Sequence, residues 1–209
     1  MGDDITIYLV GMGPGNIKNL TIEAIEVLKD SSKIISFGRI GDVAQEFNKN
    51  ISKVKTLNEI GYLLENKSMI EENIAILASG DPCFYGILEY LKRKEVRIDK
   101  IVPGVSSLQY MMSKLKKSWH NSNLVSFHGR DEEKEEKIRN IMKSQTSIIL
   151  TDSNNTPNNI SKLLYEKGLK GKIYAGYNLS YEDEKIIIGN IGDEINYESS
   201  LALVVVEVD

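Results

Sequence analysis

The sequence predicts an α/β fold in which two α/β domains follow one another along the chain. Short apolar runs end at glycine, serine or proline, and stretches with helical spacing follow most of them. This order of strand, glycine turn and helix is typical of a parallel sheet with helices packed on its faces. In the second half, the apolar runs at 185–189 and 201–208 are separated by a loop too short for a helical crossover. We therefore expect these two strands to be antiparallel and their sheet to be mixed.

The composition is that of a globular protein and excludes several functional classes. Hydrophobic residues make up 41% and charged residues 27% of the 209 residues, which argues against disorder and fibrous repeats. The net charge of −4 argues against a general nucleic-acid binder. The longest apolar run, 201–206, is far shorter than the about 20 residues of a membrane span. No basic segment followed by an apolar one marks a secretion signal at the N-terminus, so we expect a cytoplasmic protein.

The cysteine and histidine counts limit the metal and redox chemistry that the chain can carry. A single cysteine cannot form an internal disulfide, and two histidines cannot assemble a zinc cluster with it. We therefore expect no protein-bound metal.

Four strands and two helices are predicted in the first half. Each strand is an apolar run, at residues 6–10, 33–37, 73–78 and 96–102. Thr21 is a suitable N-cap for the first helix, in which Ile22, Ile25 and Leu28 form an inward stripe. Ser106 is expected to cap a second helix that carries apolar residues at 108, 111, 112 and 115.

The second half is expected to begin after a polar stretch at 114–123, which is rich in lysine, serine and asparagine. The predicted domains are therefore 1–114 and 115–209. The predicted strands of the second domain are 124–127, 147–150, 172–175, 185–189 and 201–208, and its predicted helices are 131–142 and 157–166.

A glycine-rich turn, Gly-Met-Gly-Pro-Gly-Asn at 11–16, follows the first strand. Glycines allow backbone N–H groups to approach a ligand, as in a phosphate loop. The dinucleotide fingerprint nevertheless fails, because Asn16 replaces its third glycine, and no Gly-Lys-Ser or Gly-Lys-Thr completes a Walker loop. Pro14 also removes one N–H donor from the turn. A tight strand-to-helix turn without a ligand is the alternative interpretation.

A second turn, Ser-Gly-Asp-Pro-Cys-Phe-Tyr-Gly at 79–86, follows the third predicted strand. Ligands in open α/β sheets gather at the carboxyl ends of strands, so Asp81 is a candidate partner for ribose hydroxyls or a cationic centre. An Asx turn that only caps the loop is an equally good interpretation of Asp81. Cys83 has no evident base beside it, which argues against nucleophilic cysteine chemistry.

Two further turns carry polar side chains. Pro-Gly-Val-Ser-Ser at 103–107 offers hydroxyl groups that cap a helix or bind a ligand. Phe-His-Gly-Arg at 127–130 puts His128 and Arg130 at the end of a predicted strand, where a substrate role and a structural role are equally favoured for the histidine.

The order and spacing of these turns closely resemble the tetrapyrrole methylase family, whose members transfer methyl groups from S-adenosylmethionine to corrin and sirohaem precursors. The resemblance covers essentially the whole chain. Three further stretches, at 127–130, 150–157 and 178–184, resemble the branch that methylates C5 of cobalt-precorrin-7. Tyr177 departs from the pattern, because that branch usually has an acid before its Asn-Leu-Ser motif. A second methylase unit that acts at C15 and decarboxylates is fused to some relatives and is absent from this sequence.

The resemblance implies two α/β domains with S-adenosylmethionine bound in the cleft between them, and no metal. It places Gly13 and Pro14 at the border of the cofactor site. The methionine part would be held by Ser79, Gly80, Asp81, Ser106 and Ser107, and the adenosine would be surrounded by Thr151, Asn178, Leu179 and Ala202. Methyl transfer is an in-line displacement, in which the main contribution of the protein is alignment. Asp81, His128 or a tyrosine is a candidate for a base that removes a proton from the acceptor carbon.

A tetrapyrrole precursor carries many carboxylates, so a net-negative protein must concentrate positive charge where it binds one. Arg39, His128 and Arg130 are the candidate substrate-binding residues, whereas Lys116 and Lys117 are slightly better explained as solvated surface. The alternatives are a methylase of another tetrapyrrole position and a non-catalytic subunit that binds S-adenosylmethionine. The resemblance also implies a homodimer and a separate C15-methylating decarboxylase as partner.

Overall fold

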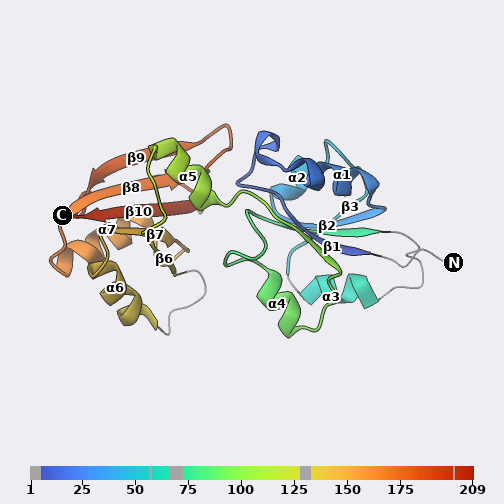
Figure 1. Ribbon diagram of the computed structural model, residues 1–209, viewed down its shortest axis with the longest axis horizontal. Helices are drawn as coiled ribbons and strands as arrows, with labels where there is room; N and C mark the ends of the chain where they lie inside the picture. Colours follow the sequence, from blue (N-terminus) through green and yellow to red (C-terminus); the bar gives the residue numbers. More distant parts are fainter. Residues whose placement is uncertain (1–5, 57, 66–72, 128–132, 200) are drawn as a thin grey trace. The chain divides into compact units, whose positions relative to one another are not determined.

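The computed structural model describes residues 6–56, 58–65, 73–127, 133–199 and 201–209. The chain forms two compact units, Met1–Ser106 and Ser107–Asp209. Both have α/β architecture, as predicted, and most of their helices and strands are labelled in Figure 1. The division precedes the predicted boundary after residue 114, because helix α5 (Ser107–Leu115) packs against β10 (Ala202–Val208) of the second unit.

The first unit contains a five-stranded sheet in the order β3-β2-β4-β1-β5. Every pair of neighbouring strands in it is parallel, which confirms the predicted parallel sheet. The strands are β1 (Ile7–Gly11), β2 (Lys33–Phe37), β3 (Ile51–Val54), β4 (Ile74–Ala78) and β5 (Lys100–Val102). The edge strand β3 was not predicted, because its sequence, Ile-Ser-Lys-Val, has two polar residues in the middle and therefore lacks a continuous apolar run. Strand β5 is shorter than predicted, since residues 96–99 run as an irregular segment.

Helices cover both faces of this sheet (Figure 1). On one face lie α1 (Ile22–Asp30) and α2 (Ile40–Ala44), and on the other α3 (Asn58–Glu65) and α4 (Leu88–Arg93). The predicted N-cap of α1 is confirmed, because the Thr21 side chain accepts a hydrogen bond from the backbone N–H of Ala24. The predicted inward position of Ile22 is wrong. Ile22 is 77% exposed, since Ala24 and Leu28, one turn apart, form the buried face of α1.

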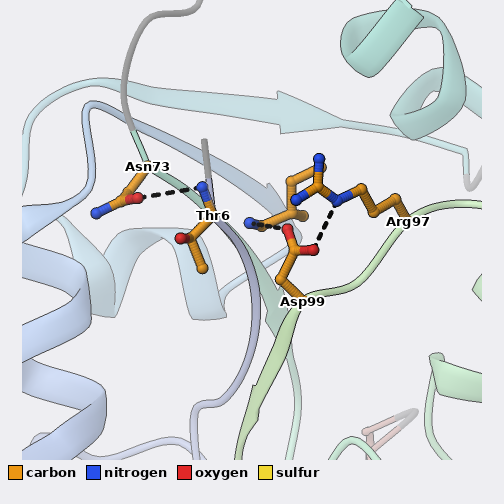
Figure 2. Close-up of polar contacts among 5 residues, drawn as sticks. Thr6, Asn73, Arg97 and Asp99 are labelled. Carbon is orange, nitrogen blue, oxygen red and sulfur yellow. Dashed lines mark hydrogen bonds and ion pairs between the residues drawn. The ribbon is translucent and has the colours of Figure 1, made fainter. Parts of the chain in front are cut away.

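Polar side chains set the register of β1 at the amino-terminal edge of the sheet (Figure 2). The Asn73 side chain accepts from the backbone N–H of Thr6 at 3.2 Å, and Asp99 accepts from that of Ile7 at 2.8 Å. The other oxygen of Asp99 accepts from the Arg97 guanidinium at 2.6 Å. Asn73 and Asp99 precede β4 and β5, so the contacts at this edge align β1 with both of its neighbours, and hence the loops at the opposite edge.

The second unit contains a mixed five-stranded sheet in the order β6-β7-β10-β8-β9. Its strands are β6 (Asn123–Ser126), β7 (Thr146–Leu150), β8 (Gly171–Tyr177), β9 (Lys185–Asn190) and β10. Strands β6 and β7 are parallel, whereas β8 pairs antiparallel with both β9 and β10. The prediction that the last two strands are antiparallel to one another is therefore wrong. Strand β8 lies between them, so β9 and β10 run in the same direction.

The two faces of this sheet are covered by different helices (Figure 1). Helices α6 (Lys134–Met142) and α7 (Pro157–Glu166) pack on one face and complete the main core of the unit. Helix α7 begins at Pro157, as predicted, and proline suits this first position. The structure adds that the Thr156 side chain caps the helix by accepting from the backbone N–H of Asn159. Helix α5 lies on the other face, where a Cβ added at Gly176 would meet the Met111 sulfur at 2.7 Å. Gly176 therefore allows α5 to approach β8 closely.

An ion pair fastens the end of α5 to the sheet of the second unit. The Lys117 ammonium lies 2.8 Å from both carboxylate oxygens of Glu207, and the Tyr174 hydroxyl donates to one of them at 2.9 Å. Burial by itself would raise the pKa of Glu207, but the hydrogen bonds from Lys117 and Tyr174 outweigh it and hold that pKa below its usual value. Lys117 is thus a structural contact of the second unit and not a free surface charge.

Glu207→Gln should destabilise the protein in a pH-dependent way. At pH 7 we expect the free energy of unfolding to fall by about 1 kcal/mol, the scale of a partly exposed ion pair. A carboxylate with a lowered folded-state pKa stabilises above its unfolded pKa, and that stability is lost as the pH falls through the folded value. The difference from wild type should therefore begin to shrink as the pH falls below the usual carboxyl pKa of 4.5, and it should vanish only below the lowered folded-state pKa. Urea unfolding at several pH values measures it.

The matched control is Glu166→Gln, which makes the same charge change on an exposed residue of α7. It should leave the free energy of unfolding unchanged. A Glu207→Gln protein as stable as this control at pH 7 would contradict the assignment.

Candidate functional site

Three glycines bring together the loops that follow three adjacent strands of the first unit. Gly11 ends β1, Gly80 follows β4 and Gly104 follows β5. A Cβ added at Gly11 would lie 2.5 Å from the backbone nitrogen of Gly104 and 2.8 Å from the carbonyl oxygen of Gly80. A Cβ at Gly104 would collide with the same carbonyl. No side chain fits between these backbones, so the loops form one continuous surface of backbone atoms.

The glycine-rich turn after β1 is joined to the turn after β4 by a pair of backbone hydrogen bonds. The Gly80 N–H donates to Gly13 at 2.8 Å, and the Gly13 N–H donates to Gly80 at 3.3 Å. Both glycines have positive φ, 67° and 65°, which other residues rarely adopt. A phosphate loop offers backbone N–H groups to its ligand. Here the N–H groups of Gly13 and Gly80 are bonded within the protein, and Pro14 has no N–H group. These two N–H groups are therefore not available to a phosphate.

Asp81 joins the loops after β4 and β5 through its carboxylate. One oxygen accepts from the backbone N–H of Cys83 at 2.8 Å, as in an Asx turn. The other accepts from the backbone N–H of Gly104 at 3.2 Å. Partial burial, followed by the charge of Asp81, raises the pKa of the Cys83 thiol, which disfavours the nucleophilic thiolate. Of the two interpretations of Asp81, the Asx turn is observed, and the bond to Gly104 extends it across the sheet edge.

The other predicted residues of this unit lie along the same edge or next to it. Ser79 is exposed and immediately follows β4. Ser106 is buried at the end of the loop after β5, and Ser107 begins α5 in the second unit. Arg39 is exposed and precedes α2, just after the carboxyl end of β2. Because β2 is adjacent to β4 in a parallel sheet, Arg39 is at the edge that carries the glycine turns.

In the second unit, three of the predicted adenosine-binding residues meet at one edge of the sheet. Strand β10 is antiparallel to β7 and β8, so its start lies beside their ends. The Thr151 hydroxyl, just after β7, donates to the carbonyl of Ala202 at 2.7 Å. The Asn178 backbone N–H, just after β8, donates to the carbonyl of Leu201 at 3.0 Å. The antiparallel pairing therefore places Thr151, Asn178 and Ala202 together.

The turn after β8 has an unusual backbone that is held by side chains. Asn178 and Ser180 have φ of 45° and 72°, the left-handed region that non-glycine residues avoid. The Asn178 amide donates to Asp183 at 2.7 Å, and its oxygen accepts from the Ser199 hydroxyl at 2.6 Å. Between the two, Leu179 is buried beside Gly176. The turn is therefore held in one shape by the polar groups around it.

Tyr177 is a core residue of the second unit. It is 1% exposed and belongs to the main hydrophobic cluster of the unit, and burial raises the pKa of its hydroxyl. An ionised acid at this position would be buried among apolar side chains. The tyrosine therefore replaces the acid of the family pattern with a side chain that packs.

His128 and Arg130 lie outside the residues that the structure describes, so their predicted roles remain predictions. The strand before them ends at Ser126, and Phe127 is buried. Among the described residues, no cluster of three or more histidine, cysteine or carboxylate side chains is arranged to hold a metal ion. Within the same ranges, every helix is too short or too polar to cross a membrane.

Sequence reasoning missed two features of these sites. The contact of Gly11 with Gly104 joins residues far apart in the chain, although their glycine identity after predicted strands was a signal. The ion pair of Lys114 with Glu184, at 3.2 Å, ties α5 to the turn after β8. Lys114 had no signal in the sequence, since a lysine in a polar stretch is usually solvated.

Comparison with known proteins shows similarity along nearly the whole chain. Residues 6–194 match the family model of tetrapyrrole (corrin/porphyrin) methylases. A protein of Methanocaldococcus jannaschii, named as a probable cobalt-precorrin-7 C(5)-methyltransferase, is 32% identical over 209 residues that cover 96% of each chain.

Two crystal structures show the same fold. A precorrin-6Y methylase of cobalamin biosynthesis from Archaeoglobus fulgidus is 25% identical, covers 97% of each chain and superposes with a TM-score of 0.72. A uroporphyrin-III C-methyl transferase from Thermus thermophilus, complexed with S-adenyl homocysteine, is 22% identical, covers 97% of each chain and has a TM-score of 0.75.

Asp81→Ala should destabilise the protein, because it leaves the N–H groups of Cys83 and Gly104 without their acceptor. We expect the free energy of unfolding to fall by about 1–3 kcal/mol. The free energy of unfolding of Asp81→Asn should lie between those of wild type and Asp81→Ala, since the amide keeps one oxygen acceptor. Urea unfolding measures the differences.

Cys83→Ser is the matched control in the same turn. It changes an exposed side chain and keeps the backbone N–H that Asp81 binds, so its stability should equal that of wild type. An Asp81→Ala protein as stable as this control would show that the carboxylate does not hold the two loops.

Proposed function

This chain belongs to the family of tetrapyrrole (corrin/porphyrin) methylases, and we propose that it methylates C5 of cobalt-precorrin-7 in cobalamin biosynthesis, with S-adenosylmethionine as methyl donor. The observation that carries the proposal is the 32% identity, over 96% of both chains, to the relative named for this reaction. The likeness to the precorrin-6Y methylase structure supports the same branch of the family.

The first unit would contact the methionine part of the methyl donor. Its contributors would be the backbone at Gly80 and the hydroxyls of Ser79 and Ser106, with the turn at Gly13 and Pro14 at the border of the site. Ser107, at the start of α5, would add a further hydroxyl. The fit rests on electrostatics. A sulfonium ligand has no phosphates, and in these turns the N–H groups of Gly13 and Gly80 each donate to the carbonyl oxygen of the other glycine. Asp81, held between two loops, would place a negative charge near the sulfonium.

The second unit would contact the adenosine. Backbone N–H and C=O groups of the turn at Asn178 and Leu179, with Thr151 and Ala202 beside it, can recognise a purine through hydrogen bonds. Their shared sheet edge and the fixed shape of the turn support this role.

S-adenosylmethionine supplies an electrophilic methyl carbon on a sulfur that is already a good leaving group. The residues of the protein then have to align the two reactants within about 3–3.5 Å and in line, and no covalent enzyme intermediate is required. Both oxygens of Asp81 accept backbone N–H groups, so we assign Asp81 to holding the loops and the positive charge, in place of the base role.

The substrate would be bound by positive groups that face its carboxylates. We propose Arg39, His128 and Arg130, because a guanidinium grips a carboxylate through two parallel hydrogen bonds and a histidine adds a further donor. The finer expectations belong to the same proposal: a cytoplasmic homodimer that binds no metal and acts beside a separate C15-methylating decarboxylase.

The direct test is incubation with methyl-labelled S-adenosylmethionine and cobalt-precorrin-7, followed by mass spectrometry and NMR of the product. We expect one labelled methyl group at C5. Label at another carbon would identify a methylase of another position. No label, combined with a thermal shift on adding S-adenosylhomocysteine, would identify a non-catalytic binding subunit. Ligand at a hundred times its dissociation constant should add about 2.7 kcal/mol to the stability.

His128→Ala tests whether alignment dominates. If His128 only grips the substrate, the variant should raise KM for the tetrapyrrole by about tenfold, the loss of about 1.4 kcal/mol of binding, and lower kcat much less. Initial rates at varied substrate concentration measure both constants. A loss of several decades in kcat with KM unchanged would instead make His128 the base.

A further inference from the structure

The carboxylate of Glu184 links the turn after β8 to helix α5. One oxygen accepts from the backbone N–H of Ser180 at 2.7 Å, and the other lies 3.2 Å from the Lys114 ammonium. The Tyr110 hydroxyl is hydrogen-bonded to the same carboxylate, and the Lys114 ammonium lies 5.1 Å from the centre of the Tyr110 ring. All four residues belong to the second unit. A single side chain thus contacts the backbone of the turn and two side chains of the helix.

The surroundings keep this carboxylate ionised. Burial by itself would raise the pKa of Glu184, but the Ser180 N–H, Tyr110 and Lys114 together hold it below its usual value. The pKa of Lys114 is raised, first by its hydrogen bond with Tyr110 and then by Glu184. Both partners are therefore charged at neutral pH.

The turn that Glu184 holds is strained. A left-handed conformation costs most non-glycine residues about 1–2 kcal/mol, and asparagine adopts it more readily than serine. Both Asn178 and Ser180 adopt it. Such a backbone persists only where surrounding groups determine it, and it is often found where a ligand is bound. Asp183 holds Asn178 from one side, and Glu184 holds Ser180 from the other. The peptide groups around Leu179 lie between these two anchors.

The helix end of the link belongs to the face on which α5 begins. Ser107, Tyr110 and Lys114 are spaced three and four residues apart, so they lie on one face of α5. Glu184 contacts this face through Tyr110 and Lys114. The turn at Asn178–Ser180 and the start of α5 are therefore joined through one carboxylate.

We propose that Glu184 is a positioning residue for the methyl donor, which fixes the turn at Asn178 and Leu179 against α5 before the ligand binds. The inference rests on the proposed function, in which this turn contacts the adenosine and Ser107 the methionine part. Glu184 itself does not contact the ligand. A purely structural ion pair at this place would be worth little and would leave the ligand affinity unchanged.

The test is Glu184→Gln, which keeps the size of the side chain and removes its charge. We expect the dissociation constant for S-adenosylhomocysteine, measured by calorimetry, to rise about tenfold, since one charge-assisted contact that holds the site is lost. The KM for S-adenosylmethionine should rise by a similar factor while kcat stays within about twofold. Lys114→Met should give a smaller loss in the same direction, because it leaves the bond to Ser180 in place.

Glu182→Gln is the matched control, an exposed carboxylate in the same loop with the same change of charge. It should bind S-adenosylhomocysteine as wild type does. Glu184→Gln with wild-type affinity would overturn the inference. If that variant does not fold, Lys114→Met decides: weaker binding supports positioning, and wild-type affinity overturns it. Failure of the wild-type protein to bind S-adenosylhomocysteine would overturn the proposed function instead, so the two failures are distinguishable.

Discussion

The first unit depends on one constraint, the close approach of the backbones of Gly11, Gly80 and Gly104. Adjacent strands of a sheet lie only about 4.8 Å apart, so loops that turn across their ends compete for the same space. The three glycines resolve this competition because none brings a Cβ into the contact. Asp81 then bonds the second loop to the third. The resulting surface consists largely of backbone atoms, and its shape is set by packing within the protein.

This packing changes the electrostatic character of a glycine-rich loop. In phosphate-binding loops, the N–H groups point to the ligand and favour negative charge. Here the N–H groups of Gly13 and Gly80 each donate to the carbonyl of the other glycine, and the N–H of Gly104 donates to Asp81. Pro14 has no N–H group. What remains is a surface with a fixed negative charge, on which the N–H groups of Gly13, Gly80 and Gly104 are already bonded. Under the proposed function, that balance favours a sulfonium over a pyrophosphate.

The second unit reaches a similar result by other means. Its site residues meet because an antiparallel strand begins where two neighbours end, so a single strand order brings Thr151, Asn178 and Ala202 to one edge. The conformation of the turn is fixed by carboxylates of the same loop. Asp183 and Glu184 bind Asn178 and Ser180, which adopt left-handed backbone conformations although neither is a glycine. The turns of the first unit are therefore positioned mainly by close backbone packing, with Asp81 as an additional link, and the turn after β8 is positioned by polar and charged side chains.

Local signals in the sequence determined every strand except β3, the helix cap at Thr21, the start of α7 at Pro157, the parallel sheet of the first unit and the chemical character of the turns. They suffice because each depends on residues a few positions apart. Only the tertiary structure decided that β8 separates β9 from β10, that α5 joins the second unit, and that Asp81 holds a loop 23 residues further along the chain. Strand neighbours and hydrogen-bond acceptors of this kind are chosen by competition among distant segments for the same sheet edges and donors, and local spacing carries no record of that choice.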